Sequence, residues 1–267
     1  MFIVGERINA TRKRVGEAVL RQDADLIRRE ALRQVEAGAD MLDVNGGIEA
    51  RDAEFLPWLV QVVQDAVDVP LCLDSPNPEA LRRALPLCKQ KPMINSITGE
   101  PDRLEQFLPL VKEHRTRVIA LCIGTSGMPS GVEDRLETAT TLVETLTSAG
   151  VPPEDIYVDA GIFPVSSAPE QPRSALEALG LVTQRFPQVH TIGGMSNVSF
   201  GLPLRKLLNT VFLTMAMARG LDSAIVDPCD RQLMANIAAA EALLGRDEYC
   251  AGYLRAYRQG KLEPEAS

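Results

Sequence analysis

Aromatic side chains are scarce in this chain. Only 4% of its 267 residues are Phe, Trp or Tyr, so the stacking on exposed bases that single-stranded nucleic-acid binding uses is not favoured. Positive charge is also in the minority, with 28 Lys and Arg against 36 Asp and Glu and a formal net charge of -8. An acidic chain has no broad attraction to phosphate backbones or anionic membranes. We therefore expect neither a nucleic acid nor a membrane as a partner.

Long apolar runs and clustered metal ligands are missing as well. No stretch approaches the roughly 18 apolar residues that cross a bilayer, and Glu6 and Arg7 interrupt the apolar start too early for a signal peptide. The five cysteines include no C-x-x-C pair, and the two histidines, His114 and His190, are far apart in the sequence. No zinc site built on local spacing is predicted. We expect reduced cysteines and a cytoplasmic protein.

Eight short apolar runs recur along the chain, and amphipathic segments separate them. The predicted strands lie at residues 2–6, 41–45, 70–75, 92–96, 117–124, 156–161, 190–197 and 224–228. Between them, segments such as 24–39, 54–67 and 134–150 place apolar residues at the i, i+3, i+4 spacing of a helix. This alternation predicts an α/β fold with a parallel sheet, and eight repeats fit a (β/α)8 TIM barrel better than a doubly wound sheet.

The chain is predicted to form a single domain over residues 1–267. No linker rich in Gly, Ser or Pro divides it. The part after Gly245, residues 246–267, is predicted to be a short C-terminal helix followed by a polar tail.

Most of the predicted strands end in a side chain that forms specific hydrogen bonds. These residues are Glu6, Asp43, Asn45, Asp74, Asn95, Asp159, Asn197 and Asp227. In a barrel the C-terminal ends of the strands meet at one face, where active sites lie. Any one of these residues alone could instead cap the next helix or form a turn. Ser75 or Asn77 could take that role in place of Asp74, and the segment after Asp159 does not resemble a helix start.

Together these residues predict a rim of carboxylates and amides that contains no lysine or histidine. Such a rim has no nucleophile, no Schiff-base lysine and no metal cluster. A charged carboxylate accepts two N–H groups from an amino-pyrimidinone edge, and each charge-assisted bond contributes roughly 1.5–3 kcal/mol. An amide supplies both a donor and an acceptor. The rim therefore suits a neutral heterocycle rich in N–H donors.

Several motifs now resemble those of a known family, in the same order along the chain. They are GERIN (5–9), LDVN (42–45), LCLDS (71–75), MINS (93–96), DRLETA (134–139), VDAG (158–161), GGMSNVSFGLPLR (193–205) and FLTMAMARGLDSAIVDPCD (212–230). The chain resembles the pterin-binding methyltransferases, and specifically the methyltetrahydrofolate:corrinoid protein methyltransferases, which are related to the folate domain of cobalamin-dependent methionine synthase. The resemblance covers nearly the whole chain.

The resemblance implies a fold, a reaction and partners. It implies a TIM barrel that forms a homodimer and binds 5-methyltetrahydrofolate at the C-terminal ends of its strands. The methyl group passes to cobalt(I) of the corrinoid (cobalamin) cofactor of a partner corrinoid protein. Because that metal belongs to the partner's cofactor, no metal ligands are expected in this chain.

The resemblance also implies the roles of individual residues. Asp74, Asn95 and Asp159 hold the pterin ring, and Asn197 lies close to the methyl-bearing nitrogen and helps its protonation. The predicted catalytic residues are Asn197, Asp159 and Asp74, and the predicted substrate-binding residues are Asn9, Asp43, Asn45, Asp74, Asn95, Asp159, Gly194, Ser196, Asn197 and Arg205. Arg205 could equally contact the partner protein or form a structural ion pair. Gly124 departs from the family pattern, because many relatives carry Asp or Asn there, so a contact is missing or a water replaces it.

Two other functions fit parts of this pattern. A dihydropteroate synthase has the same barrel, but that family needs a lysine in the loop after the seventh strand, where this chain has SNVS (196–199). A non-catalytic folate-binding module of a larger corrinoid complex would need the same pterin site without turnover. Ser196 or Ser199 could also simply cap the helix that follows.

Overall fold

Short strands alternate with longer helices along the chain, as the apolar pattern predicts. This computed structural model describes residues 1–47 and 51–263. The strands in those residues are β1 (Phe2–Asn9), β2 (Met41–Asn45), β3 (Leu71–Asp74), β4 (Met93–Thr98), β5 (Arg117–Leu121), β6 (Ile156–Asp159), β7 (His190–Ile192) and β8 (Ser223–Val226). The α-helices there are α1 (Lys13–Arg21), α2 (Ala24–Glu36), α3 (Asp52–Gln64), α4 (Pro78–Ala84), α5 (Pro101–His114), α6 (Val132–Ser148), α7 (Gln171–Arg185), α8 (Arg205–Ala218), α9 (Arg231–Leu243) and α10 (Ala251–Arg258).

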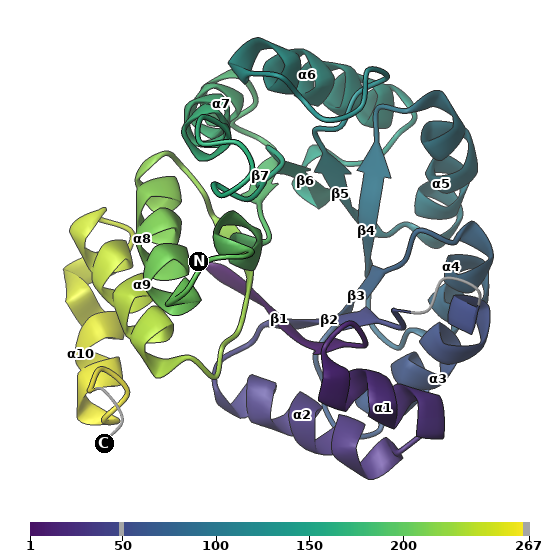
Figure 1. Cartoon of the computed structure of the whole chain (residues 1–267), viewed down its shortest axis with the longest axis horizontal. Coiled ribbons are helices and arrows are strands. Elements are labelled where there is room, and N and C mark those ends of the chain that lie inside the picture. The colour runs from purple at the N-terminus through teal and green to yellow at the C-terminus, as the bar shows by residue number, and fades with distance from the viewer. Residues whose placement is uncertain (48–50, 264–267) are drawn as a thin grey trace.

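The strands form one parallel sheet that curls into a barrel with the helices outside it (Figure 1). The order is β7-β6-β5-β4-β3-β2-β1-β8. In the described part of the chain β7 and β8 meet through an isolated bridge between Gly194 and Ile225, where the Ile225 N–H donates to the Gly193 carbonyl at 3.0 Å. The predicted (β/α)8 barrel is confirmed.

Side-chain caps start several of the helices. The Asp23 carboxylate accepts the Leu26 N–H at the start of α2, at 3.0 Å. The Asn77 side chain accepts the Glu79 N–H at 2.9 Å and so caps α4. Because Asn77 caps α4, the Asp74 carboxylate at the end of β3 is available for another role. This is the alternative to helix capping that the sequence left open for Asp74.

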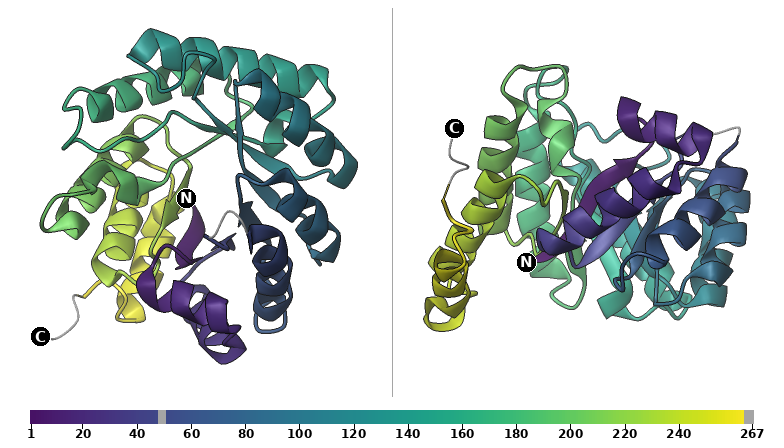
Figure 2. Two further views of the ribbon diagram at one scale, coloured as in Figure 1. Left: turned by 45° about the vertical axis from the view of Figure 1, so that its right-hand side comes forward. Right: turned by 90° about the horizontal axis from the view of Figure 1, so that it is seen from below.

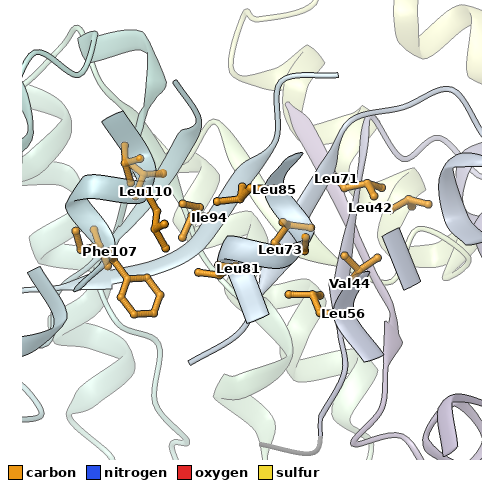
Figure 3. Packing of buried hydrophobic residues seen from close by; sticks show 14 of the residues in the cluster. Leu42, Val44, Leu56, Leu71, Leu73, Leu81, Leu85, Ile94, Phe107 and Leu110 are labelled. Carbon is orange, nitrogen blue, oxygen red and sulfur yellow. The ribbon is translucent and has the colours of Figure 1, made fainter. Parts of the chain in front are cut away.

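The layer between sheet and helices is filled by branched aliphatic side chains. Leu42, Val44, Leu71 and Leu73 project outwards from β2 and β3 toward α3 and α4, and Figure 3 shows them facing Leu56 and Leu81. Leu81 is fully buried. Because side chains alternate along a strand, the residue between Leu42 and Val44 and the residue between Leu71 and Leu73 point into the barrel instead.

The chain continues beyond the barrel into a 3-10 turn, Glu248–Cys250 (η5), and α10. Figure 2 shows α10 outside the ring of helices, where it packs on α9. Residues 264–267 of the predicted polar tail lie outside the described residues, so the predicted limits of the domain stay a prediction. Within residues 1–47 and 51–263, no helix is both long and apolar enough to span a membrane.

Candidate functional site

The barrel interior has an apolar floor with a polar layer above it. The floor takes a residue from each strand: Val4, Met41, Cys72, Met93, Ile119, Tyr157 and Ile192 form a buried cluster, and Ile225 packs against it. Two residues further along the chain from each of these come Glu6, Asp43, Asp74, Asn95, Leu121, Asp159, Gly194 and Asp227, of which Gly194 and Asp227 lie just beyond the ends of β7 and β8. Side chains on a strand repeat their direction every two residues. The polar side chains therefore point into the barrel, one layer closer to the C-terminal ends.

A cavity of about 760 Å³ opens over this polar layer. Its lining includes Glu6, Asn9, Thr11, Arg12, Asp43, Asp74, Asn95, Gly194, Ser196, Asn197, Phe200, Arg205, Lys206, Asn209, Ile225, Asp227, Asp230 and Leu233. Eight of the ten predicted substrate-binding residues are in that set. Asn45 and Asp159 are not among these lining residues, and each lies against a residue that is.

Neighbouring strands place carboxylates and amides in contact. Asp74 and Asn95 face each other in the register of β3 and β4. The Asn45 Nδ2 donates to Asp74 Oδ2 at 2.7 Å, and the Asn95 Nδ2 donates to Asp43 Oδ1 at 3.2 Å. The other side of the Asn45 amide, its Oδ1, is buried without a hydrogen-bond partner in the described residues. This acceptor has almost no accessible surface, and Asn45 lies outside the cavity lining.

Burial governs the acidity of these carboxyl groups. Desolvation raises the pKa of Asp74 to about 6, with the Asn45 amide working in the opposite direction. It raises the pKa of Asp43 well above the usual range, and the nearby charge of Asp74 adds to that effect. Asp74 is therefore mostly ionised at neutral pH, whereas Asp43 retains its proton more strongly.

Next to Asp74, Ser75 contacts Asp52, a residue that the sequence analysis did not single out. The Ser75 hydroxyl donates to the buried Asp52 carboxylate, and the Ser75 N–H donates to the Asn95 carbonyl at 3.2 Å. The charge of Asp52 contributes to the raised pKa of Asp74. An acidic residue in the first turn of a helix is normally exposed to solvent, so there was no reason in the sequence to expect Asp52 to be buried beside the site.

Asp159 is buried at the end of β6. Its carboxylate accepts the Gly161 N–H at 2.8 Å, and burial raises its pKa to about 6 even though the N–H groups of Gly161 and Gly194 favour the charged form. The fully buried Arg135 lies nearby and donates to the Ala160 and Gly161 carbonyls at 2.7 and 3.1 Å. This arginine, within the DRLETA motif, fixes the segment that follows Asp159.

The ends of neighbouring side chains lie close to the two glycines after β7. A β-carbon on Gly193 would come within 2.5 Å of Ile162 Cδ1 and 2.7 Å of Met195 Cε, and one on Gly194 would meet the Asn197 Nδ2 at 3.1 Å. Next comes a 3-10 turn, Met195–Ser199 (η4), in place of the continued strand that was predicted. The turn carries Asn197 to the cavity, where its side chain is exposed and forms no hydrogen bond with the described residues.

Residues from two other elements hold η4 in place. The Ser196 hydroxyl donates to both oxygens of Glu6, at 2.9 and 3.0 Å, and Arg12 binds the same carboxylate at 2.7 Å. Arg205, the first residue of α8, donates to the Ser196 carbonyl at 2.6 Å and to the Ser199 hydroxyl at 3.1 Å. Since α8 begins after Leu204 without a side-chain cap, neither Ser196 nor Ser199 caps it.

Gly124 lies outside this cavity lining. It forms a tight turn after β5, with backbone hydrogen bonds to Gly127 in both directions at 3.2 and 3.0 Å. A β-carbon at Gly124 would lie 3.0 Å from the Thr138 hydroxyl. A larger residue at this position would therefore need Thr138 to move.

Metal chemistry has no candidate ligand cluster in the described chain. Residues 1–47 and 51–263 contain no group of three or more His, Cys, Asp or Glu side chains placed to hold a metal ion.

Comparison with known proteins finds relatives that agree with the family predicted from the motifs. The family model described as pterin binding enzyme matches residues 5–227. The chain is 37% identical over 267 residues to a methylcorrinoid:tetrahydrofolate methyltransferase of Eubacterium limosum, covering 99% of this chain and 98% of that protein. It is 31% identical over 240 residues to methionine synthase of Mycobacterium tuberculosis (strain ATCC 25618 / H37Rv), which is 85% of this chain and 20% of that protein. The family resemblance predicted from the motifs is confirmed.

Solved structures share the architecture at lower identity. Dihydropteroate synthase from Xanthomonas albilineans, in complex with 7,8-dihydropteroate, superimposes with a TM-score of 0.71 at 18% identity, over 92% of this chain and 94% of that one. Dihydropteroate synthase from Thermus thermophilus gives 0.68 at 20% identity, over 91% and 93%. At such identities the likeness concerns the fold alone.

Proposed function

This chain belongs to the pterin-binding enzyme family, and we propose that it transfers a methyl group between tetrahydrofolate and a corrinoid carried by a partner protein. The transfer is chemically reversible, so 5-methyltetrahydrofolate is either the donor or the product. The near full-length similarity to a methylcorrinoid:tetrahydrofolate methyltransferase is the observation that carries this proposal.

The cavity supports a pterin as the bound ring. Asp74 is the ionised carboxylate that accepts the paired N–H groups of the amino-pyrimidinone edge, and Asn95 beside it offers an amide. Asn45, which donates to Asp74 at 2.7 Å, is proposed to bind the ring beside it. We place Asp159 at the far side of the ring, where its carboxyl group favours positive charge on the pterin. Asn9, Asp43, Gly194 and Ser196 complete the proposed substrate site.

Asn197 is the proposed catalytic amide. An amine anion is a poor leaving group, so methyl transfer from N5 requires that nitrogen to gain positive character. An amide is not a strong acid, but it orients a proton or a water and stabilises the protonated nitrogen as charge develops. The exposed side chain of Asn197, on a turn that Arg205 and Glu6 hold, supports this proposal.

The first test replaces Asn197 with Ala and follows methyl transfer from 5-methyltetrahydrofolate to free cob(I)alamin. Loss of one hydrogen-bonding group aimed at a developing charge costs about 100-fold or more in rate, while the dissociation constant for the folate should change less than threefold. Asn236→Ala, an amide on α9 outside the cavity lining, is the matched control. Equal losses in binding and rate would contradict the role of Asn197.

The same assay separates the rival functions. Tight folate binding without turnover on cob(I)alamin or any corrinoid protein would favour a non-catalytic folate-binding module. Condensation of a pterin pyrophosphate with para-aminobenzoate would favour a dihydropteroate synthase. Either result would overturn the proposed methyl transfer. We further propose a cytoplasmic homodimer, in keeping with the family resemblance.

A further inference from the structure

Arg103, in the first turn of α5, binds the backbone at the ends of two site-bearing strands. The hydrogen bonds that its guanidinium donates in the described residues all go to main-chain carbonyls. Nη1 donates to the Pro76 carbonyl at 2.8 Å, and Nη2 donates to the Ser75 carbonyl at 3.5 Å. Nε and Nη2 both donate to the Ser96 carbonyl, at 3.1 and 3.0 Å. The arginine therefore joins the segment that follows β3 to β4.

The carbonyls that Arg103 binds come directly after two residues of the proposed pterin site. Asp74 and Asn95 are the last pair in the register of β3 and β4. β3 ends at Asp74, so the carbonyls that come next lie beyond that strand. Arg103 ties the two strand ends together at the point where the ladder between them stops.

The guanidinium of Arg103 is itself held in one orientation. Its Cζ lies 3.7 Å from the centroid of the Phe107 ring, and Phe107 is fully buried in the core between sheet and helices (Figure 3). Arginine stacks on aromatic faces in this way while its planar edge remains free to donate hydrogen bonds. One face of the guanidinium thus rests on the core, and its edge faces the strand ends.

The helix does not account for a cation at this position. The N-terminal turn of a helix is partly positive, so it favours acidic side chains such as Asp102 and disfavours cations. Burial also disfavours the charged form of Arg103, because it lowers the pKa of the guanidinium. A residue that opposes its local preferences is characteristic of functional sites.

Charged groups surround Asp74 from several elements. Burial raises the pKa of Asp74 to about 6, and the charge of Asp52 on α3 acts in the same direction, whereas that of Arg103 on α5 lowers it. Asp43 on β2 is a further carboxyl group whose pKa is coupled to the charge of Asp74. Cys72 on β3 is a neutral thiol, since burial raises its pKa well above the usual range. Arg103 is the cation among these groups.

We propose that Arg103 is a positioning residue of the pterin site, which holds Asp74 and Asn95 at the spacing that the amino-pyrimidinone edge requires. Its charge also favours the ionised form of Asp74, the form that accepts two N–H groups. That the bound ring is a pterin rests on the proposed function, whereas the contacts of Arg103 with the two strand ends do not.

The first measurement follows the titration of the Asp74 carboxyl group in the ligand-free chain by carbon-13 NMR, with the resonance assigned from its loss in Asp74→Asn. Arg103→Met should move the midpoint upward by a few tenths of a pH unit, because the cation that favours the carboxylate is gone. Arg103→Lys retains the charge and should leave the midpoint near that of the wild type. Lys112→Met, an exposed cation on the same helix, is the matched control.

The second measurement is the affinity for 5-methyltetrahydrofolate at neutral pH, by isothermal titration calorimetry. Arg103→Met should weaken binding about tenfold. Arg103→Lys should weaken it less but still measurably, because an ammonium does not reproduce the planar fork that binds three carbonyls. If Arg103→Met does not fold, Arg103→Gln, which keeps a neutral amide donor, takes its place in both measurements.

The outcomes separate a positioning role from a purely structural one. A residue that only stabilised the loops would lower the melting temperature in both variants and leave the Asp74 midpoint where it is. An unmoved midpoint or a wild-type folate affinity in Arg103→Met would overturn the proposal. If the wild-type chain bound no folate, the proposed function would fail, and the ligand-free titration would still decide for or against Arg103.

Discussion

Asp74 is a half-buried carboxyl group whose proposed role in recognition opposes its contribution to stability. Burial raises its pKa in the folded protein to about 6, against 3.8 for the ordinary side chain. Between these two values the folded state holds a proton that the unfolded state has released. The protein is therefore most stable at low pH, where the group is protonated in both the folded and the unfolded state. The free energy of unfolding falls as pH rises through this window, and above pH 6 the whole cost of burying the charged carboxylate remains.

Asp74→Asn should therefore make the protein more stable at pH 7.5, by of order 1–3 kcal/mol in the free energy of unfolding. The gain should vanish near pH 4, because the wild-type carboxyl group is then largely neutral as well. The amide oxygen can still accept from Asn45. Urea denaturation at the two pH values measures this, and folate binding should weaken at least tenfold. Asp65→Asn on the surface is the control; a loss of stability at pH 7.5 would contradict the assignment.

The polar rim could be predicted from the sequence, because inward-facing positions recur every two residues and a polar residue at the end of an apolar run stands out. Asp74, Asn95 and Asn197 were found in this way. Asp52 and Arg135 were not, since a charged residue in a helix usually faces water and only the packed structure reveals its burial. Glu6 was recognised as part of the rim, but its contact with Ser196, 190 residues away, could not be seen in the sequence.

At the scale of elements, the number and order of strands were predicted, but some of the ends were not. The predicted strand at 117–124 ends at Leu121, and that at 190–197 ends at Ile192. Apolar residues continue past Leu121 as Cys122 and Ile123, whereas two glycines follow Ile192. The strand pairing stops at the first point before a glycine turn and at the second before a 3-10 turn. The local sequence predicts that a strand is present, whereas hydrogen bonding to the neighbouring strands determines where that strand ends.

The position of η4 depends on Arg205, which joins it to the start of α8. Arg205→Met should lower the methyl-transfer rate about tenfold, because Asn197 would then be held less firmly. A rate loss of this order is typical when a contact that positions a catalytic group is removed. Folate affinity should change little, since Asp74 and Asn95 belong to other strands. A steady-state comparison of kcat with KM measures this, with the exposed Arg173→Met on α7 as control. A larger effect on KM than on kcat would assign Arg205 to folate binding instead.

The molecule as a whole carries an apolar surface on the side of the barrel, apart from the cavity at the C-terminal ends of the strands. Along α8, Leu204, Leu207, Val211 and Met215 are 79%, 63%, 50% and 51% exposed. Their spacing of three to four residues makes one stripe, beside a groove of about 760 Å³ between α7 and α8. A ridge and a groove on the same face can engage their counterparts on a second copy across a two-fold axis.

Val211→Asp should accordingly convert the expected homodimer into a monomer. A charge placed in the centre of an apolar contact loses its hydration without gaining a partner. Analytical ultracentrifugation measures the mass, and Leu243→Asp, at a side chain 88% exposed on α9, is the control. An unchanged mass for Val211→Asp would place the dimer contact elsewhere.

The seam between β7 and β8 has a consequence for motion. In the described chain one backbone hydrogen bond, from Ile225 to Gly193, closes the barrel there, whereas β3 and β4 share a continuous ladder. Local opening therefore requires least free energy at this seam. The amide hydrogen of Ile225 should exchange with solvent deuterium faster than that of Ile94, although both lie in the barrel wall. The turn that carries Asn197 starts at this same seam, so it can adjust to a ligand while the other strands stay paired.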